Sequence, residues 1–249
     1  MTRGSKVDIE VGCWRTSFVR VVFGVACFVW MAASSVVAQQ QPAASPSASP
    51  APQQNQMAAD EWGDTFDGTA LDATKWERFS FEGAGGGKLE IKGGQLRMRG
   101  MSGSRSGVRS KQSFASDRVI FEAKLMRVDT ALPTVGEKDA PLGFAVLALM
   151  FDGSGRNRVE WVLTSERTFE AWAIVDGQGE RLDNRKLGTK EKTPTLAIVR
   201  RGDEFLFVLN GQVGLQKVIK NLPRSFRVML YGFSSTENHW DEVRVVAAK

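Results

Sequence analysis

The residues best suited to chemistry lie in two short alternating runs, "RVEWVL" and "TFEAW". Successive side chains of an extended strand point to opposite faces, so Arg158 and Glu160 share one side of the first run, as Glu170 and Trp172 do in the second. An indole beside hydrogen-bonding charges suits a sugar ring, which stacks its C–H face and needs partners for its hydroxyls. We expect all four side chains on one open face. A register shift of one residue would instead bury Trp172 in the core.

The elements that would position these residues are short strands throughout. Alternating apolar and polar runs are separated by turn signals such as GG, DG, GD and NG. This pattern is typical of a sandwich of two antiparallel sheets. The run "FAVLALMF" is apolar at every position, which predicts a central strand that is covered on both faces or closely packed on one. We therefore predict an all-β fold.

The chain divides into three segments. Residues 1–38 resemble an export signal, with Arg15 and Arg20 before an uncharged apolar run that ends in small residues. The alternative is a retained anchor, because that run just reaches membrane-spanning length. Residues 39–59 contain mainly Pro, Ala, Ser and Gln without charge, which predicts a disordered linker. Residues 60–249 then form one domain, secreted or periplasmic, with no membrane contact unless the signal segment is retained.

Composition excludes several classes of function. The formal net charge is +5 and falls to +3 without residues 1–38, which hold four basic and two acidic residues. Both signs are interspersed, which argues against a nucleic-acid partner. Both cysteines, Cys13 and Cys27, precede the linker, so the domain has no disulfide or thiolate metal site. The single histidine, His239, argues against a Ser/His/Asp triad or a multi-histidine zinc site, and we expect it in a solvated loop.

Several motifs along the domain resemble a known family. The opening "DTFDGTALDATKWERF" is followed by "KGGQLRMRG", by "SGVRSKQSFASDRVIFEAKLM" and, at the end, by "FLFVLNGQ" and "HWDEVRVV". In this order they resemble the concanavalin A-like lectin/glucanase superfamily, in particular family 16 glucanases and 3-keto-glycoside hydrolase-like domains. The resemblance covers essentially all of residues 60–249. It implies a jelly roll of two curved sheets, whose concave side receives a polysaccharide in relatives.

The catalytic motif of those glucanases is not matched. Retaining enzymes use two carboxylates about 5–5.5 Å apart, and alternate positions of one strand supply them as Glu-x-Asp-x-Glu. The corresponding positions here hold Arg158, Glu160 and Val162. With one carboxylate left, we expect no catalysis of the family 16 type. An enzyme of another arrangement would have to combine Glu160 with Glu122 or Glu170.

Further contact residues come from the preceding strands. The resemblance matches "VIFEAKLM" to a glucanase strand that points an acidic and a basic residue into the cleft, here Glu122 and Lys124. Alternation agrees that both lie on the polar side of the strand. Arg109 would lie on the strand before it. The alternative is that these are ordinary solvent-facing charges.

The resemblance also implies a calcium site on the convex side. The matching positions are Thr65 and Gly94, through backbone oxygens, and Asp241, through its carboxylate. Oxygen ligands suit calcium. Alternatively, Asp241 accepts backbone N–H bonds in a turn. No other cofactor is expected.

These observations favour an exported, noncatalytic, lectin-like domain that binds a carbohydrate or glycoconjugate. One alternative is a glycoside hydrolase or lyase with a different carboxylate arrangement, and a second is an extracytoplasmic protein-interaction module. The expected contact residues are Trp172, Glu160, Arg158, Glu122, Lys124 and Arg109.

Overall fold

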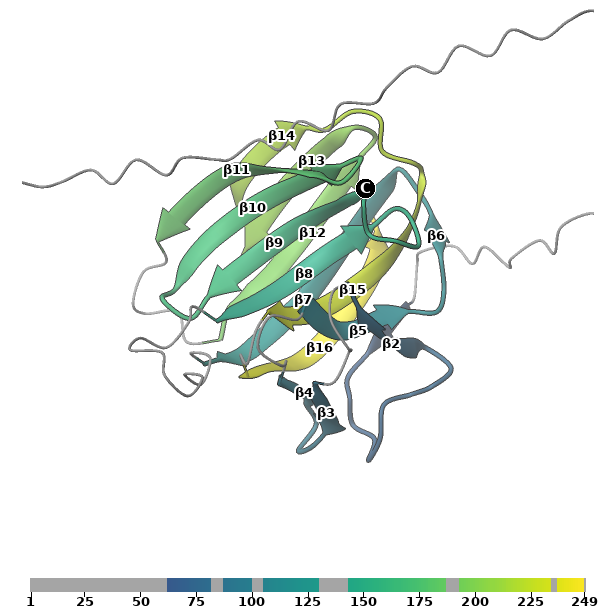
Figure 1. The fold of residues 1–249 in the computed structure, drawn as a ribbon, viewed down its shortest axis with the longest axis vertical. Coiled ribbons are helices and arrows are strands. Elements are labelled where there is room, and N and C mark those ends of the chain that lie inside the picture. Colours follow the sequence, from purple (N-terminus) through teal and green to yellow (C-terminus); the bar gives the residue numbers. More distant parts are fainter. Residues whose placement is uncertain are drawn as a thin grey trace, which may run out of the picture. The chain divides into compact units, whose positions relative to one another are not determined.

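The computed structural model describes residues 62–81, 87–99, 105–129, 143–186, 193–233 and 237–248, and the regular elements among them are all β-strands. Two antiparallel sheets of eight strands each form a two-layer sandwich. The sheet that contains β7 (Arg118–Val128) and β16 (Glu237–Ala247) is called sheet A. It lies behind the sheet that contains β8 (Phe144–Met150) and β9 (Arg158–Thr164), called sheet B, in Figure 1. The predicted all-β sandwich is therefore confirmed. The expected signal segment and linker lie outside the described residues. Within the described part of the chain, no helix long and apolar enough to cross a bilayer is found.

Sheet A combines strands from both ends of the domain. In order across the sheet they are β14 (Gln212–Val218), β13 (Glu204–Leu209), β12 (Thr195–Arg201), β7 (Arg118–Val128), β16 (Glu237–Ala247), β4 (Leu96–Arg99) and β3 (Lys88–Ile91), with β1 (Trp62–Asp64) also pairing with β16.

Sheet B is built mainly from the middle of the chain. In order across the sheet its strands are β11 (Gln178–Lys186), β10 (Thr168–Val175), β9 (Arg158–Thr164), β8 (Phe144–Met150), β15 (Ser225–Phe233), β5 (Arg105–Ser110) and β2 (Trp76–Ser80), with β6 (Phe114–Ala115) also pairing with β15.

The main core lies between the two sheets. It is filled by the apolar positions of the alternating strands, as their two-residue period requires. Trp161 of β9 stacks on Phe169 of β10 with 5.0 Å between ring centroids, and it contacts Phe207 of β13 in the other sheet. Its indole N–H donates to the carbonyl of Val208 at 3.0 Å. Trp161 therefore ties the two layers together.

A second apolar cluster covers the outer face of sheet B. Strand β8 sends Ala145, Leu147 and Leu149 into the main core, and its alternate residues join the outer cluster. This explains why the sequence of β8 is apolar at every position, and it confirms the prediction of a central strand covered on both faces. The outer cluster consists of Val146, Ala148, Met150, Val162, Met229 and Tyr231, with Phe79, Phe81, Phe144 and Trp172 packed against it.

Candidate binding groove on sheet B

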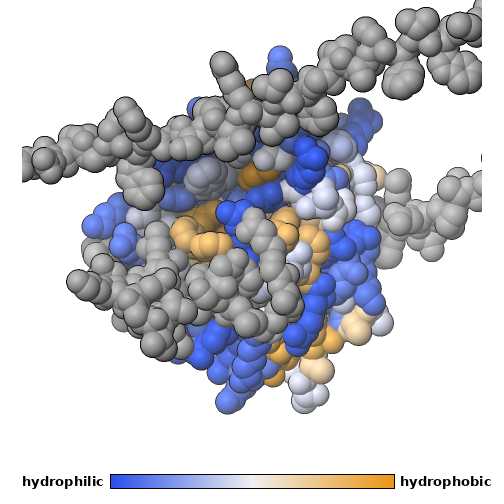
Figure 2. Space-filling model, viewed as in Figure 1, coloured by the Kyte–Doolittle hydropathy of each residue, from blue (hydrophilic) through white to orange (hydrophobic). Residues whose placement is uncertain are grey.

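A groove of about 530 Å³ lies on the outer face of sheet B, above the second apolar cluster. In Figure 2, apolar residues gather near the middle of this face and hydrophilic residues surround them. The groove is lined by aromatic, arginine and glutamate side chains together with small loop residues. Its principal lining residues are Phe81, Arg105, Phe144, Arg156, Arg158, Glu160, Glu170, Trp172, Arg181, Tyr231 and Phe233.

Strand alternation places the predicted side chains of β9 and β10 in this groove. Arg158, Glu160, Glu170 and Trp172 all line it, while Trp161 between them belongs to the main core. Trp172 lies directly opposite Glu160 in the β9–β10 pairing. The expectation that these four residues share one face is confirmed, and the alternative in which Trp172 is enclosed between the sheets is excluded.

At the floor of the groove, Glu160 is held by two donors. The Arg158 guanidinium forms an ion pair with Glu160, and the Tyr231 hydroxyl donates a hydrogen bond to the same carboxylate oxygen. Arg158 also donates to the Gly155 carbonyl and lies 4.6 Å from the ring centroid of Phe81. Although the two charged residues point outward from the sandwich, Arg158 is only 9% exposed and Glu160 only 6%. The aromatic neighbours therefore enclose this pair.

The protonation states of this cluster follow from burial and charge. Burial, and next the negative charge of Glu160, raise the pKa of the Tyr231 hydroxyl well above its ordinary value. Burial by itself would lower the pKa of Arg158, but the charges and hydrogen bonds of Glu160 and Tyr231 together outweigh it and raise that pKa. Tyr231 is thus a permanent hydrogen-bond donor at neutral pH, and Arg158 a permanent cation.

The indole of Trp172 is fixed at the wall of the groove. Its N–H donates to one carboxylate oxygen of Glu170 at 2.9 Å, and the other oxygen lies 3.6 Å from the Arg181 guanidinium of β11. Trp172 is also opposite Arg181 in the β10–β11 pairing. The ring is half-buried, so one side packs against the apolar cluster while part of it faces the groove.

The β8–β9 turn closes one end of the groove. The carboxylate of Asp152 accepts hydrogen bonds from the backbone N–H groups of Ser154, Arg156 and Asn157, at 2.9, 3.1 and 2.7 Å. Burial raises the pKa of Asp152, but hydrogen bonds from Ser154 and Asn157 outweigh it and lower that pKa. The turn signal DGSG in the sequence is therefore a carboxylate-centred turn that holds Arg156 at the groove.

Glu122 and Lys124 lie elsewhere, and the expectation that they face the cleft is wrong. Both point outward from β7, as alternation predicts, but β7 belongs to sheet A. Glu122 pairs with Arg244 at 2.7 Å, and Lys124 pairs with Asp241 at 2.7 Å. These charges sit on the outer face opposite the groove, so Glu122 cannot join Glu160 in any catalytic pair.

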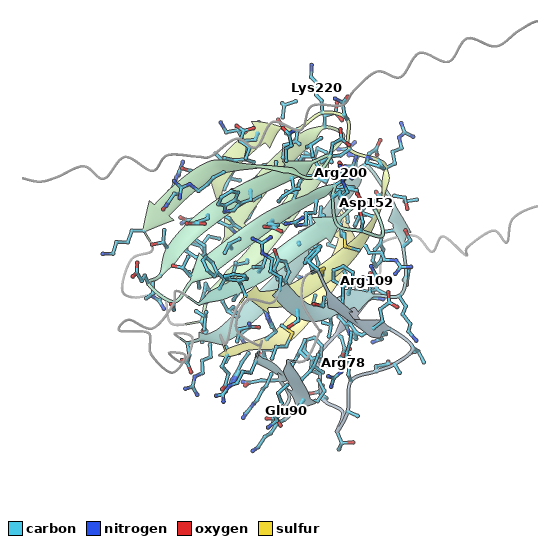
Figure 3. The ribbon with its side chains drawn as sticks, in the orientation of Figure 1. Arg78, Glu90, Arg109, Asp152, Arg200 and Lys220 are labelled. Carbon is cyan, nitrogen blue, oxygen red and sulfur yellow. The ribbon has the colours of Figure 1, made fainter. Side chains whose placement is uncertain are left out.

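Arg109 shares the outer face of sheet B but not the groove itself. It forms an ion pair with Glu77 at 2.5 Å, and its guanidinium carbon lies 4.3 Å from the ring centroid of Phe79. It lines a neighbouring hollow near the β8–β9 turn and donates to the Gly153 carbonyl at 3.2 Å, close to Asp152 in Figure 3. Strands β15 and β8 separate it from Glu160.

The expected calcium ligands do not offer a free carboxylate. The Asp241 carboxylate is neutralised by the ammonium of Lys124, whose pKa it raises. Thr65 donates its hydroxyl proton to Asp67 at 2.6 Å, and a Cβ built on Gly94 would lie 3.5 Å from Asp67. Among the residues with described placement, no three His, Cys, Asp or Glu side chains gather as a metal cluster. The calcium site formed by Thr65, Gly94 and Asp241 therefore stays a prediction.

His239 is not in a loop, so that expectation is wrong. It lies on β16, is 5% exposed, and its Nε2 is 2.8 Å from Glu237 Oε1. Strand β16 runs through His239, with register shifts beside Trp240.

Several groove residues were not predicted from the sequence. Tyr231 and Phe233 alternate along β15, and Arg105 lies on β5, so period-two reading of "SFRVMLYGF" and "RSGVRS" could have placed them on one face. Arg181 belongs to β11, which is exposed or partly exposed at every position, so no alternation marks its direction. No local pattern identifies Phe81, which reaches the groove from the end of β2 because Gly155 leaves room for its ring.

Comparison with known proteins gives matches at the level of structure. No protein-family model matches the sequence, and no curated protein matches it. Among solved structures, a chain from work titled "Prominent members of the human gut microbiota express endo-acting O-glycanases to initiate mucin breakdown" aligns with TM-score 0.58 and 16% identity, covering 76% of this chain and 99% of that one.

Two further structures extend the comparison. The endo-β-1,3-glucanase from Pyrococcus furiosus aligns with TM-score 0.58 and 13% identity over 75% of this chain and 93% of its own. The carbohydrate-binding module CBM66 from Bacillus subtilis aligns with TM-score 0.50 and 12% identity, over 70% and 96%. At these identities the likeness establishes the fold alone, and this fold is the jelly roll of two sheets that the sequence resemblance implied.

Proposed function

We propose that this protein is a noncatalytic carbohydrate-binding domain that holds its ligand in the groove on sheet B. The observation that carries the proposal is Trp172, an indole fixed at the wall of an aromatic groove and flanked by hydrogen-bonding charges. A sugar ring needs such an apolar platform for its C–H face and fixed donors and acceptors for its hydroxyls. Structural neighbours named as glycan-active enzymes and as a carbohydrate-binding module support the same ligand class.

The groove is preorganised for binding rather than for hydrolysis. Glu160 is paired with Arg158, and Glu170 receives the Trp172 N–H and lies beside Arg181. Glycoside hydrolysis of the retaining type needs two carboxyl groups about 5–5.5 Å apart. Along β9 the outward residues are Arg158, Glu160 and Val162, which supply a single carboxylate. The groove can therefore offer fixed acceptors to hydroxyl groups.

One observation favours a second candidate, a glycoside hydrolase of another arrangement. Glu170 lies opposite Val162, and Glu160 lies opposite Trp172, so the two glutamates are diagonal neighbours across β9 and β10. Diagonal positions of an antiparallel pair are roughly 7–8 Å apart. Inverting glycosidases separate their carboxyl groups by about 6.5–9.5 Å, so the backbone spacing alone is compatible with that chemistry.

The test combines binding with product release. We expect glycan-array screening to identify a ligand, and Trp172→Ala to weaken its binding at least tenfold in calorimetry, because the stacking platform is lost. Glu122→Gln, on the opposite face, should leave affinity within twofold. Release of reducing sugar that Glu170→Gln abolishes, in a variant whose circular dichroism is unchanged, would support the hydrolase instead. Failure of every glycan to bind would leave a protein-interaction module.

Export to the periplasm or the medium is part of the same proposal. Residues 1–38 have the charge and apolar pattern of a signal segment, and a polysaccharide ligand is met outside the cytoplasm. N-terminal sequencing of the protein recovered from its producing cell should begin at Gln39. An intact N-terminus in the membrane fraction would show that the segment is retained as an anchor.

A further inference from the structure

Resting on the proposed function, we propose that the ligand carries a negative charge and that Arg156 and Arg181 bind it. The anionic group would be the carboxylate of a uronic acid unit or a sulfate ester on the sugar. The observations that support this inference concern the charged side chains around the Trp172 indole.

The charges that line the groove do not balance. Its lining residues include four arginines and two carboxylates, so arginines outnumber carboxylates at the groove. The cations are Arg105, Arg156, Arg158 and Arg181, and the anions are Glu160 and Glu170. All four cations are guanidinium groups, whose planar fork matches a carboxylate or a sulfate in two parallel hydrogen bonds. A groove for an uncharged sugar would need no such excess.

Arg156 supplies one uncompensated charge. Its Nη2 donates to the backbone carbonyl of Asp176 at 2.9 Å, and among the described residues no carboxylate forms an ion pair with it. A Cβ built on Gly177 would lie 3.2 Å from its Nε, so the glycine allows the guanidinium to lie close over the β10–β11 turn. The carbonyl contact fixes the side chain while leaving its charge available.

Arg181 supplies a second, loosely held charge. Its guanidinium lies 3.6 Å from Glu170, and its side chain is 51% exposed. Glu170 already accepts the shorter hydrogen bond from Trp172. Because Arg181 is opposite Trp172 in the sheet, a charged substituent on a ring stacked against the indole would face this guanidinium. The anionic group would then compete with Glu170 for Arg181.

The buried Arg158 has a different role. Its charge is matched by Glu160 at the floor of the groove, and Phe81 covers it. It positions the carboxylate that receives sugar hydroxyls rather than the anion of the ligand. Arg156 and Arg181 at the rim therefore select the charge of the ligand. Arg158 at the floor instead holds the Glu160 carboxylate in place as a hydrogen-bond acceptor.

The experiment compares ligands that differ only in charge. Calorimetry would use tetragalacturonate against its fully methyl-esterified form, and a sulfated galactan oligosaccharide against its desulfated form. We expect at least tenfold tighter binding of the charged member of one pair, and the pair that responds identifies carboxylate or sulfate. That affinity should fall as salt rises from 50 to 300 mM, because exposed charges are screened.

Substitutions then test the two arginines. Arg156→Gln and Arg181→Gln should each weaken binding of the charged oligosaccharide at least fivefold and leave the neutral one within twofold. The matched control is Arg244→Gln on sheet A, whose side chain is 54% exposed and also pairs with a glutamate. It should change neither affinity.

The outcomes separate the inference from the proposed function. If a neutral glycan binds as tightly as its charged counterpart, and Trp172→Ala still weakens that binding at least tenfold, the inference is overturned while carbohydrate binding stands. If no glycan binds, charged or neutral, both are overturned. If charged glycans bind but the Arg244→Gln control weakens them as much as Arg181→Gln does, the attraction is general and the assignment of the two arginines is overturned.

Discussion

Strand β9 in sheet B and strand β7 in sheet A both send alternate charged residues away from the core, but the two outer faces differ in what surrounds those charges. On β9 the Arg158–Glu160 pair is nearly buried beneath aromatic side chains, with Phe81 and Tyr231 in contact. On β7 the charges of Glu122 and Lys124 remain partly exposed and pair with residues of β16. Alternation thus sets the direction of a side chain, while neighbouring strands decide whether it forms a site.

The largest difference between the faces should appear in stability. Glu160→Gln removes the counter-charge of a buried arginine, which costs about 3–5 kcal/mol when one partner of a buried pair is lost. Glu122→Gln removes a partly exposed pair and should cost less than about 1 kcal/mol. Chemical denaturation of both variants measures the difference. Equal losses would mean that the two pairs lie in equivalent surroundings.

A second comparison concerns the glycine under Phe81. Gly155 has φ 74°, and a Cβ there would lie 1.9 Å from Phe81 Cε1, whereas Gly202 in the β12–β13 turn has φ 65° and no atom within 4 Å. Both alanine variants should pay about 1 kcal/mol for the left-handed backbone.

Only Gly155→Ala should also displace Phe81 and uncover the Arg158–Glu160 pair. We expect it to lose about 1–3 kcal/mol more than Gly202→Ala, in the range for overpacking, and to alter ligand affinity. Thermal unfolding and calorimetry on the two variants measure these effects. A Gly155→Ala protein that matches Gly202→Ala in both assays would show that the Phe81 ring is free to move aside.

A smaller effect should follow pH at the far end of the sheet B face. Burial raises the pKa of Glu77, but the hydrogen bond from Arg109 and the charges of Arg109 and Arg227 outweigh it and hold that pKa below its ordinary value. A depressed folded-state pKa stabilises the protein above the unfolded value, about 4.3, and the contribution is lost as pH falls through the folded value.

Wild type should therefore exceed Glu77→Gln in stability by about 1 kcal/mol at pH 7, as for a partly exposed pair. The gap should close below pH 4. Denaturation curves at pH 7, 4 and 3 measure it. A stability difference between wild type and Glu77→Gln that stays constant from pH 7 to pH 3 would mean that packing of the Glu77 side chain, and not its charge, stabilises the protein.

The smallest effect is expected from calcium on the sheet A face. Because Lys124 neutralises Asp241, excess calcium should leave the melting temperature within about 1 °C of the value in chelator. Differential scanning fluorimetry in calcium and in EDTA tests this. A rise of several degrees that Asp241→Asn removes would mean that the ion displaces Lys124 and that the predicted site exists.

The all-β sandwich and the outward direction of the central groove residues could be predicted from the sequence because both depend on local periodicity, whereas the jelly roll was implied by the resemblance. A two-residue rhythm is enough to point Glu160 and Trp172 outward and Trp161 inward. The turn around Asp152 could be predicted for the same reason, because its carboxylate accepts hydrogen bonds from backbone N–H groups within five residues.

The errors and omissions arise where the answer depends on distant strands. Alternation correctly placed Glu122 and Lys124 on the polar side of β7, but it carries no information on which sheet receives that strand. The enclosure of Glu160 by Tyr231 and Phe81 likewise requires contacts between residues about 70 to 80 positions apart in the sequence. Such pairings follow from topology, which no short window of sequence contains.

Arg181 belongs to β11, the outermost strand of sheet B, where every residue is at least partly exposed. Arg181 itself belongs to neither apolar cluster, although its neighbour Leu182 packs against the main core, so a substitution of Arg181 removes no core contact. One of the two charges that would choose among ligands is thus carried by an edge strand, while the indole that would hold any of them lies on the next strand inward. Divergent copies of this domain could therefore acquire new ligand preferences by mutation along a single edge.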